Sequence, residues 1–286
     1  MYVITGITGQ VGGALANALL KAGKPVRAVV RDENKGMVWS ARGCEVALAT
    51  MTDADALARA FEGAEAVFIL PPPEFDPAPR FPEAREVIET IVAAIARARP
   101  RRIVCLSTIG AQAVQINLLT QRTLLEEALR KQSIPVTFLR PGWFMENCAW
   151  DVDSARDEGI LHSFLQPLDR AIPMIATEDI GELAAKLMLE EWTGARIVEL
   201  EGQQRTSPND IAAAFSAVLG KPVRAQAVPR ETWETLFVSQ GMKHPMPRIR
   251  MLDGFNEGWI DFEGRREDIL KGKTPLVDVI RKLAAR

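Results

Sequence analysis

Three glycines at a spacing of three residues stand near the start of this chain. They lie between a short apolar run, Tyr2–Thr5, and a segment with apolar residues at helical spacing, Val11–Leu19. In such a strand–loop–helix, Gly6 permits a tight turn, Gly9 lets the backbone approach a pyrophosphate, and Gly12 lets the helix pack closely. The N–H groups at the helix start favour an anion. The alternative is a plain turn, but the context favours a dinucleotide-binding loop.

The first half of the chain alternates short β-rich runs with helical patterns, as parallel βαβ units do. Most of these runs are continuously apolar, which is typical of a parallel sheet covered by helices on both faces. We therefore expect an α/β fold with a doubly wound parallel sheet, the Rossmann fold. The expected strands are Tyr2–Thr5, Val26–Val30, Glu45–Ala49, Ala66–Leu70, Arg102–Ser107 and Val136–Leu139.

The regular alternation weakens after about residue 149. We expect residues 1–149 to form the dinucleotide-binding domain and residues 150–286 to form a smaller α/β substrate-binding lobe. The elements expected in this lobe are helices over Glu178–Glu190 and from Ser207-Pro208 to Leu219, and a strand over Ile197–Leu200 that could return to the main sheet.

Composition excludes several classes of function. A net charge of −2 offers no electrostatic surface for nucleic acid or an anionic membrane. The chain has no apolar run of about 18 residues, so we expect no membrane helix. Its three cysteines are widely spaced among apolar neighbours, which argues against a disulfide framework or a metal site. We expect reduced cysteines, no metal and a cytoplasmic protein.

The end of the second expected strand, Val26–Val30, indicates which dinucleotide binds. NAD-specific sites place an acidic residue there for the ribose 2′-hydroxyl. Here Arg31 comes first and Asp32 follows. An arginine can bind a 2′-phosphate through charge-assisted hydrogen bonds, whereas a carboxylate would repel it. Lys35 and Arg27 are candidates for further positive charge. We expect NADP(H). NAD(H) stays open, because the Asp32 side chain could rotate toward the ribose 2′-hydroxyl.

Two motifs resemble those of the NmrA-like atypical short-chain dehydrogenases: the loop Thr5–Gly12 with Val30-Arg31, and Leu139–Asn147 past the sixth expected strand. Ile175–Gly181 and Val218–Pro222 also fit, so the resemblance covers nearly the whole chain. Within this family the chain looks most similar to the type-2 NAD(P)H quinone reductases and the triphenylmethane reductases. NADP-sensing transcriptional co-regulators are more distant relatives of the same group.

One departure concerns the Tyr-x-x-x-Lys pair that standard short-chain dehydrogenases carry on the helix after the fifth strand. The matching positions here hold Leu118 and Arg122, and the only tyrosine, Tyr2, belongs to the first strand. No tyrosinate can therefore serve as the general acid of alcohol–ketone chemistry. Arg122 can orient and stabilise but hardly ever loses its proton. We expect it to bind nicotinamide ribose, a substrate oxygen or a carboxylate such as Glu126; a structural salt bridge is the alternative.

Other candidates follow the expected strands. Ser107 or Thr108 could donate to a nicotinamide amide or a substrate carbonyl, or cap a turn. Trp143 and Phe144 would offer a stacking surface to flat acceptors, or be core. The proline-rich loop that carries Phe75 either shapes a pocket or is a rigid connector. The expected catalytic residues are Ser107 and Arg122, and the expected substrate residues are Trp143, Phe144 and Phe75. The expected cofactor-binding residues are Gly6, Thr8, Gly9, Gln10, Val11, Gly12, Arg31, Lys35, Leu70, Pro71, Ser107, Thr108, Arg122, Pro141, Gly142, Trp143 and Phe144.

Two functions stay open at this point. The first is an NADPH-dependent reductase of electron-poor aromatic acceptors such as quinones or cationic dyes, whose reduced products water can protonate. The second is a redox sensor that binds NADP(H) with little turnover and acts through a protein partner. The missing tyrosine fits both, and the aromatic segment favours the enzyme. An epimerase or isoflavone-reductase-like enzyme fits less well, because it usually needs the absent tyrosine or lysine. We expect no nucleic acid or membrane partner; a homodimer or a regulatory partner stays open.

Overall fold

The chain divides into two compact units in a computed structural model that describes residues 1–285. The first unit comprises Met1–Thr108, Gln121–Arg140 and Glu178–Val198. The second comprises Ile109–Thr120, Pro141–Thr177 and the chain from Glu199 onward. Each unit is therefore assembled from segments that are far apart in the sequence. The domain boundary expected at residues 149–150 stays a prediction.

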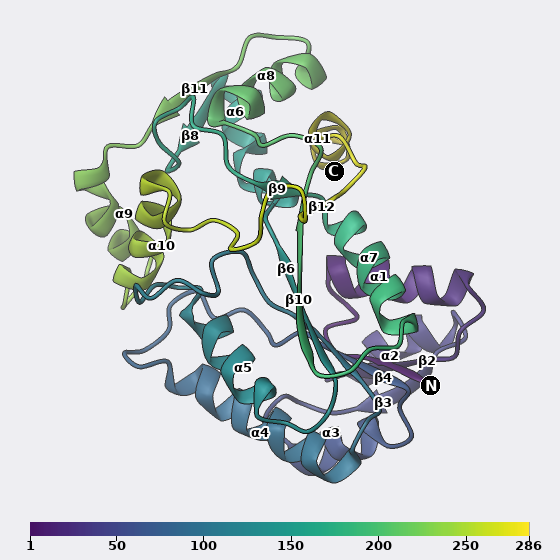
Figure 1. Cartoon of the computed structure of the whole chain (residues 1–286). Coiled ribbons are helices and arrows are strands. Elements are labelled where there is room, and N and C mark those ends of the chain that lie inside the picture. Colours follow the sequence, from purple (N-terminus) through teal and green to yellow (C-terminus); the bar gives the residue numbers. More distant parts are fainter. Residues whose placement is uncertain (286) are drawn as a thin grey trace. The chain divides into compact units, whose positions relative to one another are not determined.

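An eight-stranded sheet has the strand order β12-β10-β6-β5-β4-β1-β2-β3 (Figure 1). Strands β1 to β6 pair in parallel, and Tyr2 lies between Val26 and Ala66 in the register. This arrangement confirms the expected α/β fold with a doubly wound sheet. The strands are β1 (Tyr2–Ile4), β2 (Val26–Val30), β3 (Glu45–Leu48), β4 (Ala66–Ile69), β5 (Ile103–Leu106), β6 (Val136–Pro141), β10 (Ala195–Glu201) and β12 (Leu270–Lys271).

Helices cover both faces of this sheet, because every residue of β4, β5 and β6 is apolar or paired and must be buried. On one face lie α3 (Ala54–Phe61), α4 (Pro82–Ala98) and α5 (Thr120–Arg130) (Figure 1). Their apolar sides share a core that includes Leu57, Ile91 and Phe138.

The other face carries α1 (Gln10–Lys21) and α7 (Thr177–Leu189) (Figure 1). These two helices approach closely, since a Cβ atom on Gly181 would lie 2.5 Å from the Cβ of Ala14. Helix α2 (Glu33–Ser40) follows β2. The glycine loop follows the carboxyl end of β1, and Arg31 follows the carboxyl end of β2. Both therefore lie at the carboxyl edge of the sheet, where doubly wound folds bind ligands.

The second unit has its own apolar core, built around Phe215, Trp233, Phe237, Ile249 and Phe255. Two small sheets contribute to it, the parallel pairs β7–β9 and β8–β11. Its elements are β7 (Trp143–Phe144), η1 (Met145–Asp151), α6 (Val152–Asp157), β8 (Ile160–Ser163), β9 (Met174–Ile175), α8 (Pro208–Leu219), β11 (Arg224–Ala227), η2 (Arg230–Thr232), α9 (Trp233–Ser239), α10 (Met246–Glu257) and α11 (Leu276–Ala284).

The three elements expected in the second half of the chain are present. The helix over Thr177–Leu189 and the strand β10 differ from the expected bounds by a few residues, and β10 neighbours β6 in the main sheet. Helix α8 begins where expected, because Ser207 and Asp210 form a reciprocal capping box. The two small sheets were missed, since strands of two to four residues carry too little periodicity to be recognised.

Within residues 1–285, no helix is long and apolar enough to cross a membrane. The same range contains no cluster of three or more His, Cys, Asp or Glu side chains placed to hold a metal ion. The cysteines Cys44, Cys105 and Cys148 are buried and unpaired with one another. Burial raises the pKa of the Cys105 and Cys148 thiols well above the usual range, so neither is a reactive thiolate at neutral pH.

Candidate functional site

Two of the three glycines of the loop, Gly6 and Gly12, stand where a larger side chain would not fit. Gly6 has a φ of +66°, and a Cβ atom there would lie 3.0 Å from the side chain of Leu70. A Cβ atom on Gly12 would lie 2.2 Å from the carbonyl oxygen of Gly6. Helix α1 therefore begins directly against the loop, and the roles assigned to Gly6 and Gly12 have a steric basis.

The start of α1 is free of side-chain caps. Its N-cap residue is Gly9, which makes no side-chain hydrogen bond, and its first turn contains no acidic residue. Thr8, Gly9 and Gln10 are exposed, whereas Val11 is buried beneath them. Backbone N–H groups at such a helix start, together with the helix dipole, suit a diphosphate.

Thr5 connects the loop to the end of β4. Its hydroxyl donates to the carbonyl oxygen of Phe68 at 3.0 Å and accepts from the N–H of Leu70 at 2.8 Å. These bonds hold Leu70 against Gly6. The next residue in the chain, Pro71, is buried. The structure thus brings Leu70 and Pro71 next to the glycine loop.

Arg31 stands exposed at the end of β2, and residues 1–285 provide no ion-pair partner for its guanidinium. Asp32, by contrast, caps α2 by accepting from the N–H groups of Asn34 at 2.7 Å and Lys35 at 3.3 Å. A rotation of Asp32 into the ribose position would break this cap, which stabilises a helix by about 1 kcal/mol. The side chain of Lys35 is also exposed. The end of β2 therefore presents positive charge.

Arg27 does not add to that charge, contrary to the sequence expectation. It pairs with Glu45 at 2.6 Å and donates to the carbonyl oxygens of Ala60 at 2.7 Å and Glu62 at 2.9 Å. The guanidinium is used to connect β2, β3 and the end of α3. The correction follows from distance along the strand, because Arg27 lies near the start of β2 and Arg31 just past its end, about 13 Å apart at the rise of a β-strand.

Ser107 belongs to a buried charged cluster at the end of β5. Its hydroxyl donates to Oε1 of Glu126 at 2.5 Å, and Arg140 contacts both oxygens of that carboxylate, at 2.8 and 2.7 Å. Arg130 adds a bond of 3.2 Å. Burial alone would raise the pKa of Glu126, but the hydrogen bonds from Arg140 and Ser107 and the charge of Arg140 outweigh it. The pKa of Glu126 consequently lies below its ordinary value.

This cluster corrects two expectations. Because Glu126 is ionised, the Ser107 proton is directed at it, and only the lone pairs of Ser107 remain for a ligand. Ser107 can therefore accept from the NH₂ group of a nicotinamide amide but is not poised to donate to a carbonyl. Glu126 is also already saturated by Arg140, so it is not the partner of Arg122. Thr108, half-buried, follows Ser107 directly.

Arg122 is the half-buried cation of this region. Its Nη2 donates to the carbonyl oxygen of Pro71 at 3.2 Å, and no carboxylate in residues 1–285 forms an ion pair with it. Burial lowers the pKa of this guanidinium from its usual value, opposed by the nearby Cys105 thiol. The structural salt bridge considered from the sequence is thus absent among the described residues.

The predicted aromatic residues lie in both units. Phe75 belongs to the first and is 51% exposed on the proline-rich loop. Trp143 and Phe144 form β7 of the second unit, and the Trp143 ring meets Phe255 edge-on at 5.2 Å. Gly142 packs closely, since a Cβ atom there would lie 2.6 Å from the carbonyl oxygen of Pro173. The substrate and cofactor roles of these residues, and of Pro141, stay predictions.

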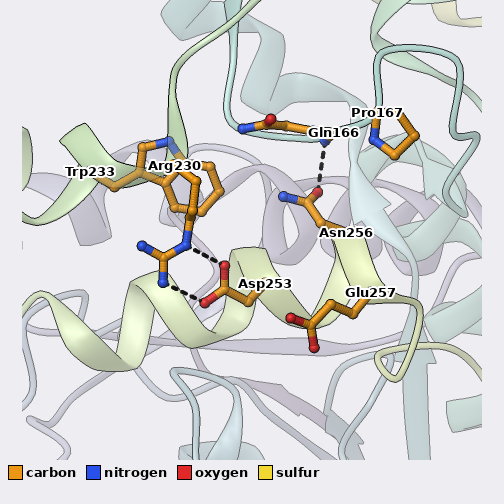
Figure 2. Close-up of a pocket in the computed structure, with 7 residues that line it drawn as sticks. All are labelled: Gln166, Pro167, Arg230, Trp233, Asp253, Asn256 and Glu257. Carbon is orange, nitrogen blue, oxygen red and sulfur yellow. Dashed lines mark hydrogen bonds and ion pairs between the residues drawn. The ribbon is translucent and has the colours of Figure 1, made fainter.

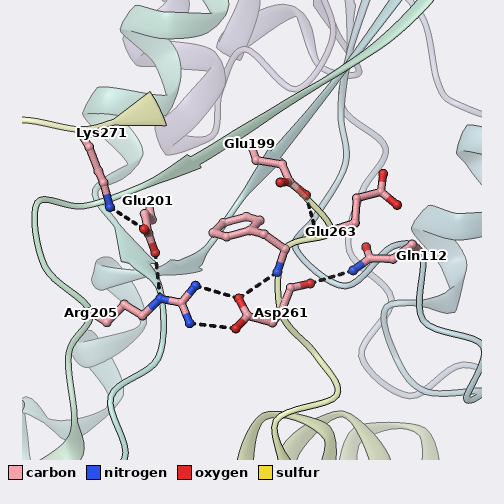
Figure 3. Close-up of polar contacts among 8 residues, drawn as sticks. Gln112, Glu199, Glu201, Arg205, Asp261, Glu263 and Lys271 are labelled. Carbon is pink, nitrogen blue, oxygen red and sulfur yellow. Dashed lines mark hydrogen bonds and ion pairs between the residues drawn. The ribbon is translucent and has the colours of Figure 1, made fainter. Parts of the chain in front are cut away.

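A charged network in the second unit holds the loop that follows β5 (Figure 3). Arg205 binds both carboxylate oxygens of Asp261, at 2.7 and 2.8 Å, and Glu201 at 3.1 Å. Gln112, within that loop, donates to the carbonyl oxygen of Asp261 at 2.7 Å. Glu199 accepts from the backbone N–H groups of residues 263 and 264. The network thus attaches the loop after Thr108 to the segment around Asp261.

A cavity of about 330 Å³ in the second unit is lined by Arg230, Asp253, Trp233 and Asn256, among others (Figure 2). Arg230 pairs with Asp253 at 2.6 and 2.7 Å and lies 4.9 Å above the Trp233 ring. Asn256 accepts from the backbone N–H of Gln166 at 2.8 Å. These groups satisfy one another, so the chemistry of this cavity does not call for a charged ligand.

Arg140 was not expected in the site, and Glu126 was expected there only as a possible partner of Arg122. A usable signal was present, because Arg140 interrupts a continuously apolar strand. A charge in such a strand needs a buried counter-charge. Glu146 was also missed; its carboxylate accepts from the N–H and hydroxyl of Thr177 and so fixes the start of α7.

Comparison with known proteins gives consistent results. The model of the NmrA-like family matches residues 2–260. The NAD(P)H azoreductase of Xenophilus azovorans is 26% identical over 246 residues, which cover 85% of this chain and 82% of that protein. Quinone oxidoreductase 2 of Escherichia coli is 27% identical over 244 residues, with coverages of 85% and 82%. The Citrobacter triphenylmethane reductase complexed with NADP(H) has a TM-score of 0.80 at 23% identity and 99% coverage of both chains, which shows a shared fold.

Proposed function

The chain belongs to the NmrA-like family, and we propose that it reduces small electron-poor acceptors, such as quinones, with NADPH. The names of the two relatives, an azoreductase and a quinone oxidoreductase, support a reductase. The observation that carries the proposal is in this chain: Arg31 is unpaired within residues 1–285 at the end of β2, beside a glycine loop shaped for a diphosphate.

NADPH fits the residues present at this edge of the sheet. The uncapped start of α1 and the loop from Gly6 to Gly12 would hold the diphosphate. Arg31, with Lys35 nearby, would bind the 2′-phosphate through charge-assisted hydrogen bonds. Asp32 is occupied as a helix cap and would not repel that phosphate from the ribose position. NADH can use the same loop but lacks the group that Arg31 recognises, so weaker NADH use is expected.

When bound, the cofactor supplies a hydride from its nicotinamide ring. The residues of the chain have the tasks of binding and orientation. The hydroxyl of Ser107 donates its hydrogen bond to Glu126, so its oxygen would accept from the NH₂ group of the nicotinamide amide and orient the ring. Arg122 would offer N–H groups to an oxygen near the reacting centre. We take Leu118 and Arg122 to occupy the positions of the Tyr-Lys pair of standard short-chain dehydrogenases. The supported acceptors are therefore those whose reduced form water can protonate.

The experiment that tests the proposal is a turnover panel with purified protein and NADPH. Para-benzoquinone, a naphthoquinone and a cationic triphenylmethane dye are offered as acceptors, and NADPH oxidation is followed by its absorbance. We expect oxidation of one NADPH for each quinone reduced. Tight NADPH binding without turnover across the panel would contradict the reductase and favour the redox sensor that acts through a protein partner. A cytoplasmic location and a homodimer stay predictions.

A further inference from the structure

A small cavity lies beside Arg122 in the first unit. Its volume is about 150 Å³. A cavity of this size can take one benzene-sized ring. The proline-rich loop after β4 forms one wall, and the facing sides of α4 and α5 form the others. The lining residues are Pro71, Pro72, Pro73, Glu74, Glu83, Ala84, Val87, Ile88, Gln121, Arg122 and Leu125.

Arg122 is the residue that makes this cavity a binding site rather than a packing defect. A guanidinium has five N–H donors, and the bond to the carbonyl oxygen of Pro71 uses one of them. Arg140 of β6, by contrast, forms an ion pair with Glu126 at 2.7 Å, which neutralises its charge. A half-buried cation without a matched anion is electrostatically costly, and an oxygen that accepts its free N–H groups would relieve that cost.

The charge around the cavity restricts what that oxygen can belong to. Glu74 and Glu83 line the same cavity as Arg122. An anionic ligand would gain from Arg122 but would also approach these two carboxylates. A neutral carbonyl compound can accept from Arg122 without that repulsion. The prolines and the side chains of Val87, Ile88 and Leu125 provide the apolar surface that a flat ring needs.

We propose that this cavity is the acceptor subsite and that it takes a single neutral carbonyl-bearing ring, a monocyclic para-quinone, with one oxygen bound by Arg122. The inference rests on the proposed reductase function. During reduction the C–H bond at the nicotinamide C4 would break, and its hydrogen and electron pair would form an O–H bond at the quinone oxygen that lies away from Arg122. The displaced carbonyl electrons become negative charge on the oxygen beside Arg122. Water then supplies the proton, so that quinone, NADPH and one proton give hydroquinone and NADP⁺.

The first test measures binding where no turnover can occur. Para-benzoquinone is titrated by calorimetry into the full chain saturated with NADP⁺, which has no hydride to give. We expect Arg122→Gln to weaken this binding by about 10- to 100-fold, the usual effect of removing a charged donor. The control is Arg97→Gln, because Arg97 is an exposed residue of α4. Equal affinity in the wild type and Arg122→Gln, or no binding to the wild type, would overturn the subsite.

The second test separates the acceptor from the cofactor. The proposal assigns Arg122 to the acceptor rather than to the cofactor, for which the sequence also made it a candidate, so we expect the dissociation constant of NADPH, measured by calorimetry, to change far less than that of para-benzoquinone in Arg122→Gln. A loss of NADPH affinity as large as the loss of quinone affinity would show that Arg122 holds the cofactor and would overturn the proposal. Wild-type protein that binds para-benzoquinone through Arg122 but never oxidises NADPH would support the subsite and contradict the reductase.

The third test concerns size. The wild type should prefer para-benzoquinone to a naphthoquinone in kcat/KM, because the cavity takes one ring. Val87→Ala removes two methyl groups from the wall and should raise the ratio of naphthoquinone to benzoquinone turnover several-fold. Thermal unfolding curves of Arg122→Gln and Val87→Ala check that both variants fold. A wild-type preference for the two-ring acceptor, or an unchanged ratio in Val87→Ala, would argue against this cavity as the acceptor site.

Discussion

The hydroxyl of Ser107 donates a hydrogen bond of 2.5 Å to Oε1 of Glu126. The two residues come from the end of β5 and from α5, and Arg140 of β6 holds the same carboxylate. Three neighbouring elements of the first unit therefore meet at one ionised group. The consequence for the site is that Ser107 presents an acceptor rather than a donor to whatever binds beside it.

Glu126→Gln should destabilise the protein by about 3–5 kcal/mol, because it leaves the buried cation of Arg140 without its counter-charge. Denaturant unfolding at neutral pH measures this change. Glu127→Gln is the matched control, since Glu127 is the exposed neighbour on the same helix, and it should change stability by less than about 0.5 kcal/mol.

The pH dependence of this effect has a definite sign. The pKa of Glu126 is lowered in the folded chain, so its contribution is present above the ordinary glutamate pKa and is lost as the pH falls through the folded value. The difference in the free energy of unfolding between the wild type and Glu126→Gln should thus become smaller below about pH 4. A gap that widens in acid would contradict the assignment.

Ser107 should discriminate between cofactor analogues. If it accepts from the amide NH₂, the wild type should use NADPH better than the acetylpyridine analogue, which has a methyl ketone in place of the amide. A loss of about 1.4 kcal/mol would appear as a tenfold lower kcat/KM. Ser107→Ala should abolish the preference, whereas Thr108→Ala should keep it. A preference for the ketone in the wild type would mean that Ser107 donates.

Arg31→Asp should weaken NADPH binding far more than NADH binding, because a carboxylate would face the 2′-phosphate that only NADPH carries. The two dissociation constants are measured by titration of the folded protein. We expect a loss of about 100-fold or more for NADPH. Arg31→Lys keeps the charge but loses the two parallel N–H donors of the guanidinium. Its NADPH affinity should lie between those of the wild type and Arg31→Asp. Equal losses for both cofactors would refute the contact with the 2′-phosphate.

Gly12→Ala and Gly13→Ala form a matched pair. The new Cβ at Gly12 would lie 2.2 Å from the Gly6 carbonyl oxygen, whereas at Gly13 its nearest atom would be 3.5 Å away. Gly12→Ala should displace the loop, with a cost of about 2 kcal/mol or more and loss of dinucleotide binding. Gly13→Ala should fold at least as stably as the wild type, since alanine is the better helix former. Thermal unfolding and NADPH titration distinguish the two.

Asp151→Asn should stabilise the protein at alkaline pH. Burial raises the pKa of this carboxyl to about 7, so the folded chain takes up a proton that the unfolded chain releases. The wild type therefore loses stability as the pH rises from about 4 to about 7, and the asparagine variant does not. Because the side chain keeps some solvent contact, we expect a gain of about 1–3 kcal/mol at pH 8 and little change at pH 4. Unfolding at both pH values measures it.

The sequence alone determined the parallel sheet, the position of the glycine loop and the placement of Arg31 at the end of β2. These features depend on patterns within a few residues: continuous apolar runs, helical periodicity, and glycines where a side chain would clash. Helix α8 also followed from local signals, since Ser207 and Pro208 are a cap and a first-turn residue.

Only the tertiary structure decided how the charged side chains are used. Glu126 and Arg140 are 14 residues apart and meet across a helix and a strand, so nothing in the sequence shows that the carboxylate of this pair also accepts the hydrogen bond of Ser107. In the same way Arg27 proved to be tied to Glu45, whereas Arg122 has no ion pair among the described residues. The physical reason is that pairing and burial depend on residues brought together from distant segments, whereas local periodicity depends on each segment alone.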